Sequence, residues 1–208
     1  MKSINQNRPS LFVLVLAGFV ATLLIGEVVA GDSKKDEPTF TATGAMIRPE
    51  GWREWIFVGS PLTPNSLNGG EAPFPEFHSV YIDPKSWEYW KKTGKFREGT
   101  MFAKELSLVG ETTATSGKGF FNGDLQGFEI AYKDSKRYSK ETGGWAYFSF
   151  GHHAEPYANS TAPMPTAACA ACHSASAADD MVFTQYYPIL QAAKAMGEKG
   201  AGVGGQAE

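Results

Sequence analysis

The sequence predicts an α+β fold, in which a mainly antiparallel β-sheet is accompanied by a few helices, one of them near the C-terminus. Several segments between residues 77 and 150 alternate apolar and polar residues with the period of two that half-buried strands show. An alanine-rich run, 167–178, comes after them, and alanine is the strongest helix former. Strands that precede a helical segment along the chain are typical of an α+β domain.

Residues 1–30 of the 208-residue chain have the features of a secretory signal peptide. Lys2 and Arg8 give a positive start, an apolar run covers 11–25, and small residues lead to a cleavage site after Ala30. Because the apolar run is short for a membrane span, we expect cleavage rather than a retained anchor. No membrane is then expected as a partner of the mature chain.

The remainder has the length of one domain. We expect a polar leader over 31–47, a single domain over 48–195 and a flexible, glycine-rich tail over 196–208. The formal net charge of −3 is mildly acidic, and this makes nucleic acid or an anionic membrane surface an unexpected partner.

The start of the domain combines helical or turn features with strand features. Residues 48–58 hold two tryptophans among apolar residues, which indicates a short helix or turn running into a strand. Residues 60–75 are rich in Gly and Pro and predict a loop, of a length that often borders a site. A strand follows at 77–82, with His78 and Val80 on the same face.

A helix is expected at 85–93. Asp83 is a suitable N-cap and Pro84 a suitable first helical residue. Trp87 and Trp90 are three residues apart and therefore share one face of this helix.

The next strand, 99–109, has one unusual residue. Alternation places Phe102, Lys104 and Leu106 on the same face, where Lys104 is the single charge. Lys104 could lie near the sheet margin and extend its ammonium group to water. Alternatively it reaches a buried cofactor, where desolvation would make the lysine lose its proton more readily and act as a nucleophile.

Two further strands are expected at 126–133 and 144–150, separated by a polar loop. The helix over 167–178 follows an irregular segment, and Thr166 is a candidate for its N-cap. Pro188 either breaks the chain there or starts a last helix.

The predicted C-terminal helix carries Cys169-Ala170-Ala171-Cys172-His173, the attachment signature of c-type haem. On a helix the two cysteines and the histidine share one face. Each thiol can form a thioether with one haem vinyl group, and His173 becomes the axial ligand of the iron. We therefore expect one covalently bound haem c on this helix. Because c-type haem is attached outside the bacterial cytoplasm, the motif and the signal peptide together predict a periplasmic protein.

Two other uses of the motif remain open. A Cys-x-x-Cys pair is a thiol–disulfide redox site in some proteins, but this use gives no role to His173. A zinc site needs about four protein ligands, and His152 and His153 would have to supply the others at a spacing that matches no standard zinc pattern.

The second axial ligand is not singled out by the sequence. Many electron-transfer cytochromes use a second histidine or a methionine. The candidates are Met46, Met101, Met164, Met181, Met196, His78, His152 and His153. None has a distinctive context, and an open or water-bound iron is therefore expected.

The chain resembles the cytochrome P460 family over most of its mature length, roughly 48–190. The resemblance is carried by the segments 48–55, 83–94, 96–106, 169–173 and 180–188. The combination of Gly-Thr-Met-Phe-Ala-Lys-Glu with Asp-Met-Val-Phe-Thr-Gln is far more specific than the haem motif alone. The family implies a mainly antiparallel β fold, usually dimeric, with a five-coordinate haem.

In catalytic members of this family a lysine bonds covalently to the porphyrin edge, and the enzyme oxidises hydroxylamine to nitric oxide or nitrous oxide. Lys104 is the matching position, so the resemblance implies an oxidoreductase that passes electrons to a small soluble acceptor. The related cytochrome c′-beta group lacks the crosslink and binds nitric oxide without turnover, and Phe102 would suit its aromatic cap. Plain electron transfer is a third alternative.

The sequence does not place one feature of the catalytic members. They use a carboxylate in the pocket for proton transfer, and the segment leading into the haem helix holds no acid. Glu105 points away from Lys104 in a regular strand, and Glu155 lies in a loop.

Overall fold

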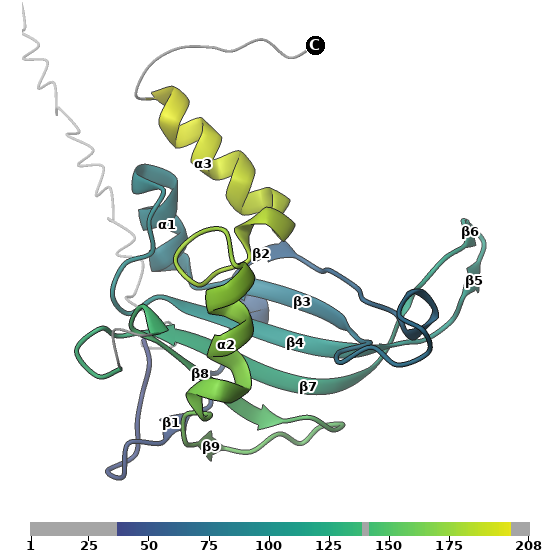
Figure 1. Cartoon of the computed structure of the whole chain (residues 1–208), viewed down its shortest axis with the longest axis horizontal. Helices are drawn as coiled ribbons and strands as arrows, with labels where there is room; N and C mark the ends of the chain where they lie inside the picture. Colours follow the sequence, from purple (N-terminus) through teal and green to yellow (C-terminus); the bar gives the residue numbers. More distant parts are fainter. Residues whose placement is uncertain (1–36, 139–141, 201–208) are drawn as a thin grey trace, which may run out of the picture. The chain divides into compact units, whose positions relative to one another are not determined.

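A five-stranded antiparallel sheet organises the chain (Figure 1), as the α+β prediction requires. The computed structural model describes residues 37–138 and 142–200, all within one compact unit. The strand order is β2-β3-β4-β7-β8. The bounds are β2 Ile56–Gly59, β3 Phe77–Ile82, β4 Met101–Val109, β7 Asn122–Lys133 and β8 Trp145–Gly151. The predicted signal peptide lies outside the described residues, so its boundary stays a prediction.

Short elements surround this sheet. The pair β1 and β9 and the hairpin β5–β6 are small two-stranded sheets, and the described residues include 3-10 turns at η2, η3 and η5. Their bounds are β1 Met46–Ile47, β9 Ser160–Thr161, β5 Thr113–Ala114, β6 Gly117–Lys118, η2 Trp52–Glu54, η3 Asn65–Leu67 and η5 Thr184–Tyr186. Strand β1 lies within the segment assigned to a leader, and Met46 is fully buried. The ordered domain thus begins before Arg48.

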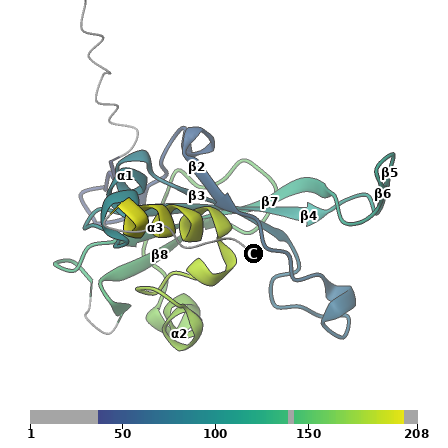
Figure 2. The ribbon, with the colours of Figure 1, turned by 90° about the horizontal axis from the view of Figure 1, so that it is seen from above.

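Three helices complete the fold: α1 Pro84–Thr93, α2 Thr166–Ser176 and α3 Pro188–Gly200. Helix α2 packs against β8 on one side of the sheet, while α3 packs against α1 and β2 (Figure 2). The N-cap of α2 is Pro165 without a side-chain hydrogen bond, which corrects the expectation that Thr166 caps this helix. The helix begins one residue earlier, with Thr166 itself already helical. Within the described part of the chain, no helix has the length and apolar character needed to cross a membrane.

The strand register decides which side chains share a face of the sheet. Lys104 of β4 is paired with Val80 of β3 on one side and with Glu129 of β7 on the other. Directly paired residues point to the same face. Val80, Lys104 and Glu129 therefore face α2, and we call this side the cavity face. The opposite face of the sheet carries a core that includes the fully buried Met101 and Phe128.

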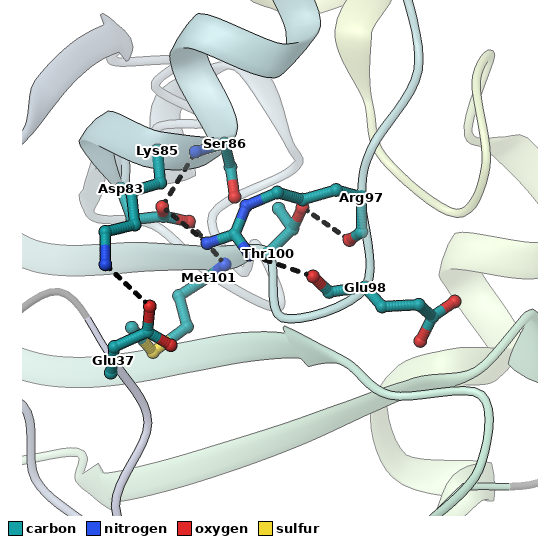
Figure 3. Close-up of polar contacts among 8 residues, drawn as sticks. All are labelled: Glu37, Asp83, Lys85, Ser86, Arg97, Glu98, Thr100 and Met101. Atoms are coloured by element: carbon teal, nitrogen blue, oxygen red, sulfur yellow. Dashed lines mark hydrogen bonds and ion pairs between the residues drawn. The ribbon is translucent and has the colours of Figure 1, made fainter.

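The start of α1 is tied to the sheet by one buried carboxylate (Figure 3). Asp83 accepts hydrogen bonds from the backbone N–H groups of Ser86 and Met101, each at 2.8 Å, and Arg97 Nη2 lies 3.4 Å away. The side chain is completely buried, and this burial raises the pKa of Asp83 although all of these donors favour the charged form. Arg97 in turn donates to the Glu98 carbonyl at 3.0 Å. Asp83 thus fixes α1 against the first residue of β4.

We expect Asp83→Ala to lower the free energy of unfolding by about 2 to 4 kcal/mol, since it removes an N-cap and leaves the buried Met101 N–H without a partner. Chemical denaturation of the haem-loaded protein measures this loss. Glu88→Ala on the same helix is the control, because Glu88 is exposed and its ion pair with Lys91 lies at the surface of the helix; it should cost less than about 0.5 kcal/mol. Equal losses in the two variants would contradict the role given to Asp83.

Candidate haem site

A cavity of about 380 Å³ lies between the cavity face of the sheet and helix α2. Phe102, Lys104 and Glu129 form part of its sheet wall, and Cys169 and His173 project into it from α2. The chain that follows α2 closes the remaining side with Phe183. The cavity therefore brings together the haem motif and the lysine that were more than sixty residues apart in the sequence.

The motif residues occupy one side of α2. Cys169 is half-buried at the cavity, whereas Cys172, one turn further, is exposed, and both thiols are free. Of the 11 residues of α2 only Ala170 is buried. The alanine-rich sequence explains why the segment is helical, but the helix buries little of its own surface against the protein. A flat group placed in the cavity would cover the face that carries Cys169 and His173.

His173 is held in the orientation that an axial ligand needs. Its Nδ1 donates a hydrogen bond to the Met181 carbonyl at 2.6 Å, because a carbonyl oxygen can only accept. Its ring lies between Tyr147 and Phe183, with centroids 4.6 Å from each. Burial lowers the pKa of His173, and a neutral ring whose Nδ1 carries the proton leaves Nε2 free to bind a metal.

Lys104 faces the cavity, as the alternation predicted, and it is paired with Glu129. The distance between Lys104 Nζ and Glu129 Oε2 is 2.6 Å, and each side chain is about a quarter exposed. The ammonium group also lies 5.1 Å from the centre of the Phe74 ring. The ion pair follows directly from the register, which places the two residues opposite each other on β4 and β7.

Sequence reasoning missed Glu129 as a site residue. The signal was the same as for Lys104: Glu129 is a single acid flanked by Phe128 and Ile130 in a strand, which places it on the opposite face from these apolar neighbours. What the sequence lacked was the pairing of β7 with β4. Only that pairing brings Glu129 to the cavity face beside Lys104.

The two acids that were considered for the pocket lie elsewhere. Glu105 faces the opposite side of the sheet and forms an ion pair with Arg53. The distance between Arg53 Nη2 and Glu105 Oε1 is 2.5 Å. The same guanidinium group binds Glu155 at 3.0 Å. The expectation that Glu105 points away from Lys104 is therefore confirmed, and Glu129 is the carboxylate that lines the cavity in its place.

His152 is a further polar residue that lines the cavity. His152 Nε2 is 2.8 Å from the buried Glu76 carboxylate, and the Phe74 ring stacks on His152.

Burial, together with the positive charge of Lys104, lowers the pKa of His78 to about 4. His78 is thus neutral at physiological pH and adds no charge beside Lys104.

The side chains considered as second axial ligands are dispersed. Those that line the cavity are Met164, Met181 and His152; those that do not are Met46, Met101, Met196, His78 and His153. The Met181 carbonyl binds the Nδ1 edge of His173, which is remote from the coordinating Nε2. His152 is engaged by Glu76. The open second axial position stays a prediction.

The residues present fit a haem. The cavity is lined largely by apolar and aromatic side chains, and Cys169 and His173 project into it from one helix face. Tyr147 Oη and Trp145 Nε1 are buried beside the cavity and have no hydrogen-bond partner among the described residues, so both are available to a bound group. For the zinc alternative, the described part of the chain holds no group of three or more His, Cys, Asp and Glu side chains arranged around one point.

Comparison with known proteins supports the same cofactor. The sequence model of the family described as Cytochrome P460 matches residues 49–184, which include Lys104, Glu129 and the whole haem motif. A search of curated proteins found no match. The family match covers well over half of the chain and both walls of the cavity. The chain therefore belongs to the cytochrome P460 family, a family of haem cytochromes.

Proposed function

We propose that the chain is a periplasmic mono-haem c-type cytochrome that oxidises hydroxylamine to nitric oxide or nitrous oxide and passes the electrons to a small soluble acceptor. The observation that carries this proposal is the position of Lys104, whose ammonium group is in the cavity wall opposite the haem motif. Cleavage of the signal peptide and a homodimeric state are part of the proposal and rest on the sequence and on the family resemblance.

In this proposal four residues hold the cofactor. Cys169 and Cys172 would form the two thioether bonds, His173 would bind the iron, and the Lys104 nitrogen would bond to the porphyrin edge. The haem would supply an iron that binds hydroxylamine and accepts its electrons. The aromatic walls around His173 limit the access of water to that side of the site.

Glu129 has the role of proton acceptor. Oxidation of hydroxylamine releases one proton for each electron removed, and the site therefore needs a base within reach. In the chain without its cofactor the Glu129 carboxylate is neutralised by Lys104. A lysine nitrogen bonded to an aromatic ring is only weakly basic and no longer carries an ammonium charge. With its nitrogen in the crosslink, Lys104 would no longer pair as a cation with Glu129, and this carboxylate would be free to accept protons.

A second candidate function is the binding of nitric oxide without turnover. Phe102 supports this alternative, since it lines the cavity two residues from Lys104 and could cap a small apolar ligand. The alternative requires that Lys104 stays unmodified and paired with Glu129, so that the pocket has no free base. The two functions are distinguished by the state of Lys104.

We expect the Lys104→Ala variant to keep its covalently bound haem but to lose most of its hydroxylamine oxidation. Its reduced optical spectrum should be that of an ordinary high-spin haem c, whereas the unaltered protein should show a red-shifted, broadened Soret band. Lys118→Ala, which changes an exposed lysine of β6, is the matched control and should behave as the unaltered protein. Full activity of the Lys104→Ala variant would refute the role of Lys104.

Glu129→Gln tests the proton acceptor separately. The amide keeps the size of the side chain but cannot accept a proton at neutral pH, so we expect kcat for hydroxylamine to fall about 100-fold. The optical signature of the modified haem and the affinity for nitric oxide should be retained. Glu111→Gln, at an exposed position, is the control. Unchanged turnover in the Glu129→Gln variant would show that another group takes the proton.

A further inference from the structure

The turn that follows α2 has an unusual backbone. Asp180 and Met181 are consecutive non-glycine residues with positive φ angles of 43° and 65°. Left-handed conformations are strained for a non-glycine residue and persist only where the surroundings hold them. The turn is closed by hydrogen bonds between Asp179 and Val182, with Val182 N 2.7 Å from the Asp179 carbonyl.

This conformation presents the Met181 carbonyl to His173. The Nδ1–O distance is 2.6 Å, and no other acceptor for Nδ1 occurs among the described residues. A hydrogen bond at Nδ1 makes the imidazole a stronger electron donor at Nε2, which favours ferric over ferrous iron. The position of one backbone carbonyl therefore influences the reduction potential of the bound haem.

Lys133, the last residue of β7, holds the turn against the sheet. Its Nζ lies 2.5 Å from Asp180 Oδ2 and 3.5 Å from the Gly143 carbonyl. The side chain is 11% exposed, and its ammonium group lies over the Trp145 ring at 5.4 Å. The Asp180 side chain is 36% exposed, so only the lysine is shielded from solvent, and removal of Asp180 would leave the Lys133 ammonium group without its carboxylate partner. The Lys133–Asp180 pair thus connects the turn to the sheet.

Asp179, the residue before Asp180, makes different contacts. Its ion pair can therefore be removed separately, which distinguishes the contribution of the Lys133–Asp180 pair from that of the other contacts of the turn. Asp179 accepts from Thr184 Oγ1 at 2.5 Å and lies 2.9 Å from Lys194 Nζ, which belongs to α3. The hydrogen bond from Thr184 and the contact with Lys194 lower the pKa of Asp179. The Asp179–Lys194 ion pair links the segment to α3, whereas the Asp180–Lys133 ion pair links the residue beside Met181 to the sheet.

We propose that Lys133 is a positioning residue: through Asp180 it fixes the Met181 carbonyl on His173 and thereby lowers the reduction potential of the haem. The proposal rests on His173 as the axial ligand, which the proposed function also assumes, but it does not depend on hydroxylamine oxidation.

The test compares the haem-loaded Lys133→Met and Asp180→Asn variants with the unaltered protein. The midpoint potential is measured by spectroelectrochemistry, and the iron–histidine stretching frequency by resonance Raman spectroscopy of the ferrous protein. We expect the midpoint potential to be higher in both variants, so that the ferric-to-ferrous ratio at a fixed applied potential is about tenfold lower than in the unaltered protein. The iron–histidine stretching frequency should also be lower. Lys133→Arg should restore both values towards those of the unaltered protein.

Lys194→Met is the matched control, since it removes an ion pair from the neighbouring acid and should leave both readouts unchanged. Unaltered potential and stretching frequency in Lys133→Met and Asp180→Asn would overturn the proposal. Loss of haem from both variants, with retention in Lys194→Met, would also overturn it, because the pair would then maintain the fold rather than tune the ligand. A protein inactive towards hydroxylamine that still shows the shifts would refute only the proposed function.

Discussion

The pairing of β4 with β7 is the interaction on which the site depends. It places Lys104 opposite Glu129 on the face that looks towards α2. A slip of one residue would turn every side chain of β4 to the other face, and Lys104 would enter the core around Phe128 while Met101 entered the cavity. Both faces of the sheet are buried against apolar clusters, and this makes such a slip costly.

Strand β7 contributes a side chain that lines the cavity and another that supports the turn beside His173. Glu129 lines the cavity where substrate chemistry is proposed, and Lys133, four residues later on the same face, holds the turn behind His173. A rigid strand fixes the distance between these two positions more firmly than two loops would. The proposed proton acceptor and the proposed support of His173 therefore lie on one strand, and a distortion of β7 would be expected to disturb both.

The sequence predicted local features well. The start of α1 followed from Asp83 and Pro84, to within one residue, and the face of Lys104 followed from alternation, because both depend on neighbours within one element. The partners of Lys104 and Lys133 could not be predicted, since an ion pair between distant segments is set by register and by the path of a turn. Strand β1 was missed for a similar reason: two residues acquire extended structure only through their pairing with β9.

The weak attachment of α2 bears on the order in which the holoprotein is made. The helix buries only Ala170, lacks a side-chain N-cap and leaves the Cys172 thiol at the surface. The two apolar clusters that pack on the sheet contain no residue of α2, so the scaffold can form before the cofactor is bound. Under the proposed covalent attachment, the two thiols of α2 would be accessible to the haem vinyl groups. The haem would then become the packing partner that α2 lacks, and cofactor loading would complete the fold.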